Sequence, residues 1–316
     1  MRIFFLNEGL FLTGGQFVNL DHVLALRRLG YDARFWFIRV NAPIADFRPA
    51  FPPGQEAPWQ VEPPELAPDD VVVVGEMFGA GALAVREARV RKVVHNQGPY
   101  LSFEAFVDMQ AFRDWGCEAM VCPSEHAAGM LRRIGWDRPL HVVRPALHPV
   151  FAPDPAVQRH RAIAAVTTKR GHELRLIRGV FRSLRPDLAK VRWIGISGLP
   201  REEVAFRMKS CEIFLALGER EGLGLPPLEA LATGALVAGF HGGGGKAYAT
   251  AENGDWFDDD RHVEIAQALI SLIDRLNAGE SFEARRKAGF AAAAGFSRPG
   301  FEAQLAAAWA ALAGPP

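Results

Sequence analysis

The chain has 316 residues, enough for about two domains of ordinary size. Its 36 Lys and Arg residues balance its 36 Asp and Glu residues, which argues against a binder of duplex nucleic acid, because such proteins usually carry a basic excess over a whole domain. With 49% hydrophobic residues the chain can bury sizeable cores, and no apolar run approaches the roughly 20 residues that cross a membrane.

Short apolar runs alternate with longer amphipathic segments from one end of the chain to the other. Between most of the runs, apolar residues recur at steps of three and four, as on one face of an α-helix. Several runs are apolar on both faces, which is typical of inner parallel strands covered by helices. The alternation predicts an α/β fold. The predicted strands are 2–6, 33–38, 71–74, 92–95, 119–122, 141–143, 162–166, 191–196, 213–217 and 236–240.

Two proline-rich stretches interrupt this alternation. Residues 43–68 hold eight prolines, too many for a helix or an inner strand, and are predicted to form a long surface connection. Residues 148–155 predict an interdomain linker, because a separate series of strands lies on each side. The predicted organisation is an N-terminal domain at 1–147, this linker, a C-terminal domain at 156–295 and a last helix within 296–316.

The most informative segment follows the strand predicted at 213–217. Pro226 or Pro227 suits the first turn of a helix, so the preceding loop lies where a strand ends and a helix begins. Open α/β sheets bind ligands at that edge, and helix amino termini favour phosphate. Gly222 and Gly224 would let the backbone approach a bound group closely.

Glu221 and Glu229 are separated by seven residues within the run E-G-L-G-L-P-P-L-E-A-L-A-T-G. This E-x7-E run resembles the donor-site signature of the retaining, family 4 glycosyltransferases of bacterial type. The resemblance implies a GT-B fold: two Rossmann-like domains face each other across a cleft, and a C-terminal helix crosses back to the first domain. It also implies that Glu229 binds the ribose of a nucleotide sugar and Glu221 the transferred hexose, since a carboxylate accepts hydrogen bonds from two neighbouring hydroxyls. The backbone beside the sugar would come from Gly222, Leu223, Gly224 and Leu225.

The alternative is that Glu229 complements a helix start and Glu221 is a solvated charge. Two spaced glutamates alone would favour that alternative, whereas the match over the whole run favours the donor site.

The donor diphosphate needs cations, because its departure concentrates negative charge on the β-phosphate. Residues 159–192 hold ten basic and two acidic side chains. Lys169 and Arg170 follow a predicted strand there and resemble the family's phosphate-binding lysine before a glycine. The arginine that the family carries about five residues earlier is absent here, so either this pair shares the task or another cation contributes. The glycine pair Gly14-Gly15 resembles one that lies near the donor phosphate in the family, and a simple tight turn is an equal alternative.

Two further positions correspond to family features. Gly244 lies in the glycine loop 241–245, predicted to approach the donor, and His95 ends a strand where family members present a histidine to the transferred sugar. A structural role for His95 is an equal alternative. The acidic run 258–260 invites a metal-site hypothesis, but GT-B enzymes generally use side-chain cations and helix dipoles, so we expect no metal and no cofactor.

The resemblance implies a metal-independent hexosyltransferase that acts on an unknown glycan or lipid-linked acceptor, such as one of surface polysaccharide or glycolipid assembly. The alternatives are a catalytically silent GT-B protein that binds a nucleotide sugar, and a GT-B epimerase. A nicotinamide-dependent dehydrogenase is suggested by the G-x-G-x-x-A run at 79–84, but three residues separate that run from its strand. A peripheral membrane contact through Arg132, Arg133, Trp136 and Arg138 competes with a solvated helix end.

The three cysteines, Cys117, Cys122 and Cys211, cannot all pair and are predicted to be small buried hydrophobic residues. The hydrophobic start of the chain is too short for a signal peptide. We therefore expect a cytoplasmic protein with reduced thiols.

Overall fold

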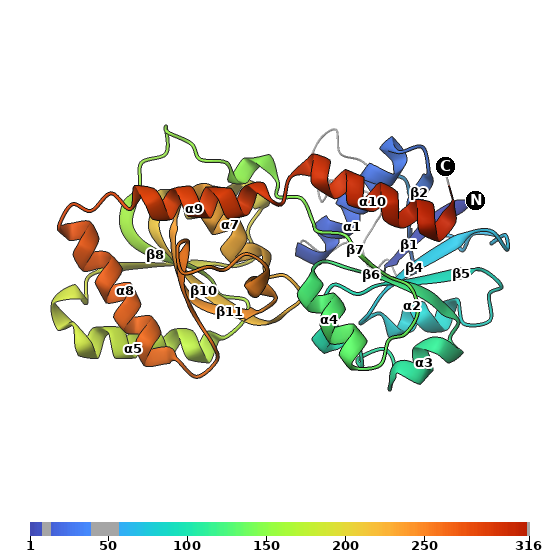
Figure 1. The fold of residues 1–316 in the computed structure, drawn as a ribbon, viewed down its shortest axis with the longest axis horizontal. Helices are drawn as coiled ribbons and strands as arrows, with labels where there is room; N and C mark the ends of the chain where they lie inside the picture. The colour runs from blue at the N-terminus through green and yellow to red at the C-terminus, as the bar shows by residue number, and fades with distance from the viewer. Residues whose placement is uncertain (8–13, 39–56, 315–316) are drawn as a thin grey trace. The chain divides into compact units, whose positions relative to one another are not determined.

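A computed structural model describes residues 1–7, 14–38 and 57–314 (Figure 1). The chain forms two compact units, Met1–Ala146 with Arg298–Pro316, and Leu147–Ser297. The domain ends predicted at 147 and 295 compare with limits at 146 and 297, and residues 148–155, predicted as a linker, belong to the second unit. The last helix, α10 (Arg298–Ala313), belongs to the first unit, as the resemblance implies.

The first unit contains a seven-stranded sheet of order β3-β2-β1-β4-β5-β6-β7, in which every neighbouring pair is parallel. Its strands are β1 (Arg2–Asn7), β2 (Asp32–Phe37), β3 (Trp59–Gln60), β4 (Val71–Gly75), β5 (Arg91–His95), β6 (Cys117–Cys122) and β7 (Leu140–Val142). Its helices, besides α10, are α1 (Gly14–Arg28), α2 (Gly79–Ala84), α3 (Met109–Asp114) and α4 (Glu125–Arg133).

The proline-rich stretch differs from its prediction in one respect. Its described part contains β3, which pairs with β2 at the edge of the sheet. Two residues between prolines are too short a run to show strand periodicity, and an edge position tolerates neighbouring prolines. Much of the stretch, residues 43–56, lies outside the described residues.

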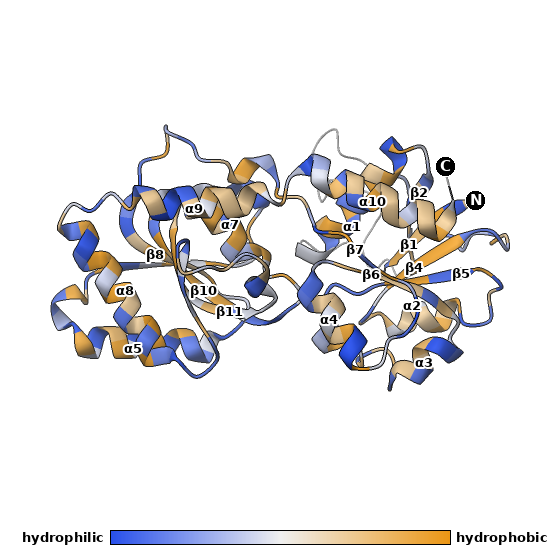
Figure 2. Ribbon diagram, in the orientation of Figure 1, coloured by the Kyte–Doolittle hydropathy of each residue, from blue (hydrophilic) through white to orange (hydrophobic). Residues whose placement is uncertain are grey.

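Alternate residues of β1 face opposite sides of the first sheet. Ile3 and Phe5 pack in a core with residues of α1 and α10, whereas Phe4 and Leu6 pack with residues of α2, α3 and α4. A strand covered on both faces must be apolar throughout, which explains the continuous hydrophobic runs in the sequence. Figure 2 shows these strands as hydrophobic ribbons between helices that carry hydrophilic segments.

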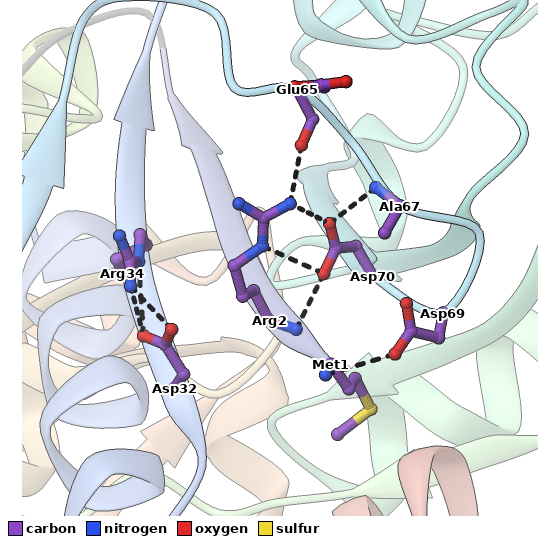
Figure 3. A network of polar contacts seen from close by, with 8 residues as sticks. All are labelled: Met1, Arg2, Asp32, Arg34, Glu65, Ala67, Asp69 and Asp70. Atoms are coloured by element: carbon purple, nitrogen blue, oxygen red, sulfur yellow. Dashed lines mark hydrogen bonds and ion pairs between the residues drawn. The ribbon is translucent and has the colours of Figure 1, made fainter.

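A buried carboxylate fixes β1 beside β4 at the amino end of the sheet (Figure 3). The backbone N–H of Arg2 donates to Asp70 Oδ1 at 2.8 Å, its guanidinium donates to Oδ2 at 2.5 Å, and Ala67 N–H donates to Oδ2 at 2.8 Å. Burial alone would raise the pKa of Asp70, but the hydrogen bonds from Arg2 and Ala67 outweigh it and lower this pKa. This network holds the register at the end of the sheet opposite to His95.

The second unit contains a five-stranded parallel sheet of order β12-β11-β10-β8-β9. Its strands are β8 (His160–Val166), β9 (Arg192–Ile196), β10 (Cys211–Glu221), β11 (Leu236–Gly243) and β12 (Gly254–Phe257), of which β12 was not predicted. Its helices are α5 (Gly171–Leu184), α6 (Arg201–Ser210), α7 (Leu225–Thr233), α8 (His262–Asn277) and α9 (Glu283–Ala294). Residues of α5 and α8 pack on one face of the sheet, and residues of α6, α7 and α9 pack on the other.

Each sheet reverses its strand order at one place. In the first sheet β1 lies between β2 and β4, and in the second β8 lies between β9 and β10. At the reversal, the connections that follow the two neighbouring strands run to opposite sides. This leaves a crevice at the carboxyl ends of the two strands, where open α/β sheets bind ligands. The ends of β8 and β10 are therefore the expected binding edge of the second unit.

Three predictions concern residues away from these edges. The three cysteines are free and buried, as predicted, and burial raises the pKa of Cys117 and of Cys122 to about 12. Trp136 is only 1% exposed, so its side chain is not available for the membrane contact predicted around it. Arg132 instead donates to the carbonyl oxygen of Trp136 and so closes the turn after α4. In the described ranges, no helix has the length and apolar character needed to cross a membrane.

Candidate functional site

Lys169 and Glu221 meet at the carboxyl edge of the second sheet, where its strand order reverses. Lys169 follows β8, Glu221 is the last residue of β10, and Lys169 Nζ lies 2.9 Å from Glu221 Oε1. The lysine side chain is 48% exposed and the glutamate side chain 21% exposed, so both ions remain accessible. An ion pair this exposed contributes little to stability, about 0–1 kcal/mol. Its two charges are therefore available to a ligand.

The loop after β10 enters α7 through a glycine that no other residue would replace without strain. Gly224 precedes the helix in the left-handed region, with φ of 84°, and Pro226 and Pro227 follow in the first turn, as predicted. Two prolines remove two of the four amide donors that a helix start leaves without partners. Amide donors for an anion here would come from residues 222–225, of which Leu223 is buried and Leu225 partly exposed.

Glu229 is enclosed by the fold, although part of its surface remains exposed. It lies in α7, one turn beyond the prolines. Burial raises the pKa of Glu229 to about 7, and the charge of Arg201 at the start of α6 opposes this rise. No hydrogen bond reaches its carboxylate from residues 1–7, 14–38 or 57–314. A buried carboxyl group that has a raised pKa and no hydrogen-bond donor beside it is a common feature of ligand sites.

Tyr248 holds the loop between the two glutamates, and the sequence did not identify it as part of the site. Its hydroxyl donates to the carbonyl oxygen of Gly224 at 2.5 Å, and the side chain is 5% exposed. Burial raises its pKa, and the charges of both Glu221 and Glu229 add to this effect, so both carboxylates lie near the phenol. Through its hydrogen bond to Gly224, Tyr248 stabilises the loop between β10 and α7. The only sequence signal was its position shortly after the glycine loop.

Gly244 brings that glycine loop against the segment after β10. A Cβ atom at this position would lie 2.6 Å from the Glu221 carbonyl oxygen and 2.6 Å from the Leu223 nitrogen. Both neighbours are backbone atoms, so a side chain here would displace the loop that carries Glu221. Gly244 is required because the glycine loop and the segment after β10 approach each other closely at this position. The sequence predicted that this loop approaches the donor.

Arg170 differs from its neighbour Lys169, although the sequence treated them as one cationic pair. Its side chain is 5% exposed, donates to the Gly218 carbonyl oxygen at 2.8 Å, and forms ion pairs with Glu173 and Asp259. Its guanidinium also lies over the Phe240 ring, 4.4 Å from the centroid. Arg170 therefore fixes β10 and the loop after β8, while Lys169 presents the exposed charge.

In the first unit, the predicted residues Gly15 and His95 are joined by two amides. Gln97 Nε2 donates to the Gly15 carbonyl oxygen at 3.1 Å and to Asn19 Oδ1 at 2.9 Å, and His95 Nδ1 lies 2.8 Å from the same Oδ1. Gly14 and Gly15 form the first residues of α1, with Gly14 exposed. Burial lowers the pKa of His95 to about 4, so its ring is neutral at pH 7.

Glu76 is a second buried acid at this edge, and the sequence did not identify it. It follows β4 and accepts hydrogen bonds from the backbone N–H groups of Gln97, at 3.1 Å, and Gly98, at 2.7 Å. Burial raises its pKa to about 7 in spite of these bonds. The glycine run suggested for a dehydrogenase forms the short helix α2, in which Gly81 is packed against the Phe78 ring.

The acidic run 258–260 forms ion pairs with basic side chains. Asp258 is hydrogen-bonded to His241 and forms an ion pair with Lys246, and Asp259 forms one with Arg170. Across the described parts of the chain, no three His, Cys, Asp or Glu side chains gather as a metal site would require.

Comparison with known proteins identifies the family. Residues 188–289, which include Glu221, Glu229 and Tyr248, match the family described as "Glycosyl transferases group 1". The alpha-1,6-glucosyltransferase of Actinobacillus pleuropneumoniae serotype 7 is 31% identical over 273 residues, which is 83% of this chain and 80% of that relative.

The fold matches those of solved glycosyltransferases. HepE of Anabaena, solved in complex with UDP, superposes with a TM-score of 0.73 at 14% identity, over 98% of this chain and all of that one. The pneumococcal O-GlcNAc transferase GtfA, solved with UDP and GlcNAc, gives a TM-score of 0.68 at 12% identity, over 96% of this chain and 97% of that one. The chain therefore belongs to the group 1 glycosyl transferases and is a glycosyltransferase with the GT-B fold.

Proposed function

We propose that the protein transfers a hexose from a nucleotide diphosphate sugar to a glycan or lipid-linked acceptor, with retention of the anomeric configuration. The observation that supports this most strongly is the accessible Lys169–Glu221 ion pair beside the buried carboxyl of Glu229. An anion and a cation at one sheet edge suit a ligand that carries both hydroxyl groups and phosphates. HepE has been solved with UDP-glucose, and the relative from Actinobacillus is an alpha-1,6-glucosyltransferase, so UDP-glucose is the first donor to test.

The donor would replace the contacts that the two ions make with each other. Its diphosphate takes Lys169, and its sugar hydroxyls take Glu221, so that neither charge loses a partner when the pair opens. Glu229, which has no hydrogen-bonding partner within the described residues, accepts hydrogen bonds from the ribose hydroxyls. The amides of residues 222–225 add neutral donors beside the phosphates.

The chemical step would be a same-face substitution at the anomeric carbon. The bond between this carbon and the β-phosphate oxygen breaks, the acceptor oxygen bonds to the carbon on the same face, and the acceptor proton passes to the departing phosphate. Lys169 and the backbone donors stabilise the negative charge that forms on the diphosphate. We expect transfer to continue in the presence of EDTA, because these groups supply the positive charge.

A thermal-shift screen with UDP-, GDP-, ADP- and TDP-sugars would identify the donor, since a ligand that binds only the folded state raises the melting temperature. Glu229→Ala should weaken donor binding, and Glu221→Ala should mainly lower turnover. If both variants transfer at the wild-type rate with limiting donor, the site assignment is wrong. The anomeric configuration of the product tests retention. A protein that binds the donor without converting it would be the silent alternative, and an isomerised sugar nucleotide would indicate an epimerase.

A further inference from the structure

The hydrogen bonds around His95 have a direction that one backbone atom sets. The carbonyl oxygen of Gly15 can only accept, so the Gln97 atom 3.1 Å from it must be the amide nitrogen, Nε2. The same nitrogen donates to Asn19 at 2.9 Å, so the Asn19 atom that faces it must be the acceptor, Oδ1. The orientation of both amides follows from this carbonyl group, although amide nitrogen and oxygen atoms are hard to tell apart by shape.

This direction determines which nitrogen of His95 carries the proton. Asn19 Oδ1 lies 2.8 Å from His95 Nδ1 and has no hydrogen to give, so Nδ1 must carry the hydrogen and donate it. A neutral imidazole holds one N–H, and burial keeps this ring neutral at pH 7. His95 Nε2 therefore has a lone pair and no hydrogen.

The Nε2 atom of His95 receives no hydrogen bond from the described residues. The centroids of the His22 and His95 rings lie 4.4 Å apart. Within the described residues, His22 Nε2 is fully buried without a hydrogen-bond partner. The His95 side chain is 3% exposed, so its Nε2 is a buried acceptor.

We propose that Asn19 and Gln97 are positioning residues that hold His95 as the Nδ1–H tautomer, so that Nε2 accepts a hydrogen bond from a ligand hydroxyl and cannot donate one to a phosphate. Glu76 completes the arrangement, because it binds the backbone N–H of Gln97 and keeps that side chain in reach of Gly15 and Asn19. The assignment of the hydroxyl to a sugar rests on the proposed function. The assignment of the tautomer does not.

Gln97→Glu tests the proposal because the glutamate side chain has nearly the same shape as glutamine, whereas its carboxylate reverses the direction of the hydrogen bond between residue 97 and Asn19. A carboxylate at this position cannot donate, so Asn19 should turn its amide to donate to it. The other hydrogen of that amide would then face His95 Nδ1 and shift the ring toward the Nε2–H tautomer. Asn19→Asp keeps the acceptor, since its carboxylate still accepts from Gln97 and His95, so the Nδ1–H tautomer should persist, although the hydrogen bond that Asn19 Nδ2 donates to Asn7 Oδ1 at 3.3 Å is lost. Gln304→Glu is the matched control, because Gln304 Oε1 accepts from Arg144 N–H and a glutamate would still accept.

The tautomer can be measured by nitrogen NMR on the full chain labelled with ¹⁵N-histidine, with the His95 signals among the nine histidines identified by their loss in His95→Gln. We expect a protonated Nδ1 and an unprotonated Nε2 in wild type, Asn19→Asp and Gln304→Glu, and a shift toward protonated Nε2 in Gln97→Glu. Transfer from UDP-glucose should fall about tenfold in Gln97→Glu, as for one lost hydrogen bond, whereas binding of UDP alone should not change.

A wild-type His95 with protonated Nε2, or a tautomer unchanged by Gln97→Glu, would overturn the proposal. An equal loss of UDP and UDP-glucose binding in Gln97→Glu would also contradict it, because the defect would then not concern a sugar hydroxyl. If wild type shows the expected tautomers but does not use UDP-glucose, the donor assignment fails and the positioning role stands.

Discussion

Replacing Glu229 with glutamine should stabilise the protein while weakening donor binding. Burial raises the pKa of this carboxyl from an ordinary value of 4.5 to about 7, so the ionised form is unfavourable in the folded state. At about 1.4 kcal/mol per pKa unit, the difference corresponds to roughly 3 kcal/mol, which the residual exposure of the side chain reduces to about 1–3 kcal/mol. Glu229→Gln removes this cost and also removes the charge that we propose for ribose binding.

The sign of this effect depends on pH. Below pH 4.5 the carboxyl is protonated in both the folded and unfolded states, so the variant should gain nothing. As the pH rises from 4.5 to about 7, Glu229 ionises in the unfolded state but stays largely protonated in the folded state. The free energy of unfolding of the wild type therefore falls over this interval. The gain of Glu229→Gln should therefore appear over this interval and remain constant above it. Glu76 titrates in both proteins, so it cancels from the difference.

Urea unfolding at pH 5 and pH 8 measures the gain, and titration with UDP-glucose measures donor affinity. The control is Glu202→Gln, an exposed glutamate of α6, which should change neither quantity. Equal stability gains at pH 5 and pH 8 would refute the argument from burial. A stability gain at pH 8 with unchanged donor affinity would refute the ribose-binding role while leaving the electrostatic argument intact.

Three other substitutions separate the ligand-binding residues from the structural ones. Lys169→Met should weaken donor affinity about tenfold or more and change the free energy of unfolding by less than about 1 kcal/mol, since its ion pair is exposed; Lys190→Met, at an exposed lysine, should affect neither quantity. Arg170→Met should lower stability by about 1–2 kcal/mol, measured by urea unfolding, because it removes the hydrogen bond to the Gly218 carbonyl oxygen and the contact with the Phe240 ring. Gly244→Ala should lower stability by about 1–3 kcal/mol and reduce transfer, since its methyl group would meet backbone atoms. A stable, donor-binding Arg170→Met or a fully active Gly244→Ala would contradict these roles.

The sequence by itself determined the parts of this protein that depend on local patterns. Hydrophobic runs located ten of the twelve strands in the described parts of the chain, because a strand buried on both faces must be apolar at every position. The two strands it missed, β3 and β12, are short and lie at sheet edges, where burial no longer imposes a pattern. The flanking glycines and prolines also indicated the junction between β10 and α7, although β10 extends to Glu221, beyond the strand end predicted at 217.

Tertiary structure decided which side chains support that loop and which remain accessible. Lys169 and Arg170 are adjacent and both cationic, yet only Arg170 is buried, because Phe240 and Asp259 lie beside it. Tyr248 reaches Gly224 across 24 residues, and Glu76 reaches Gln97 across 21. The partner of a hydrogen bond depends on where the fold brings distant segments together, whereas hydrophobic periodicity is a property of neighbouring residues.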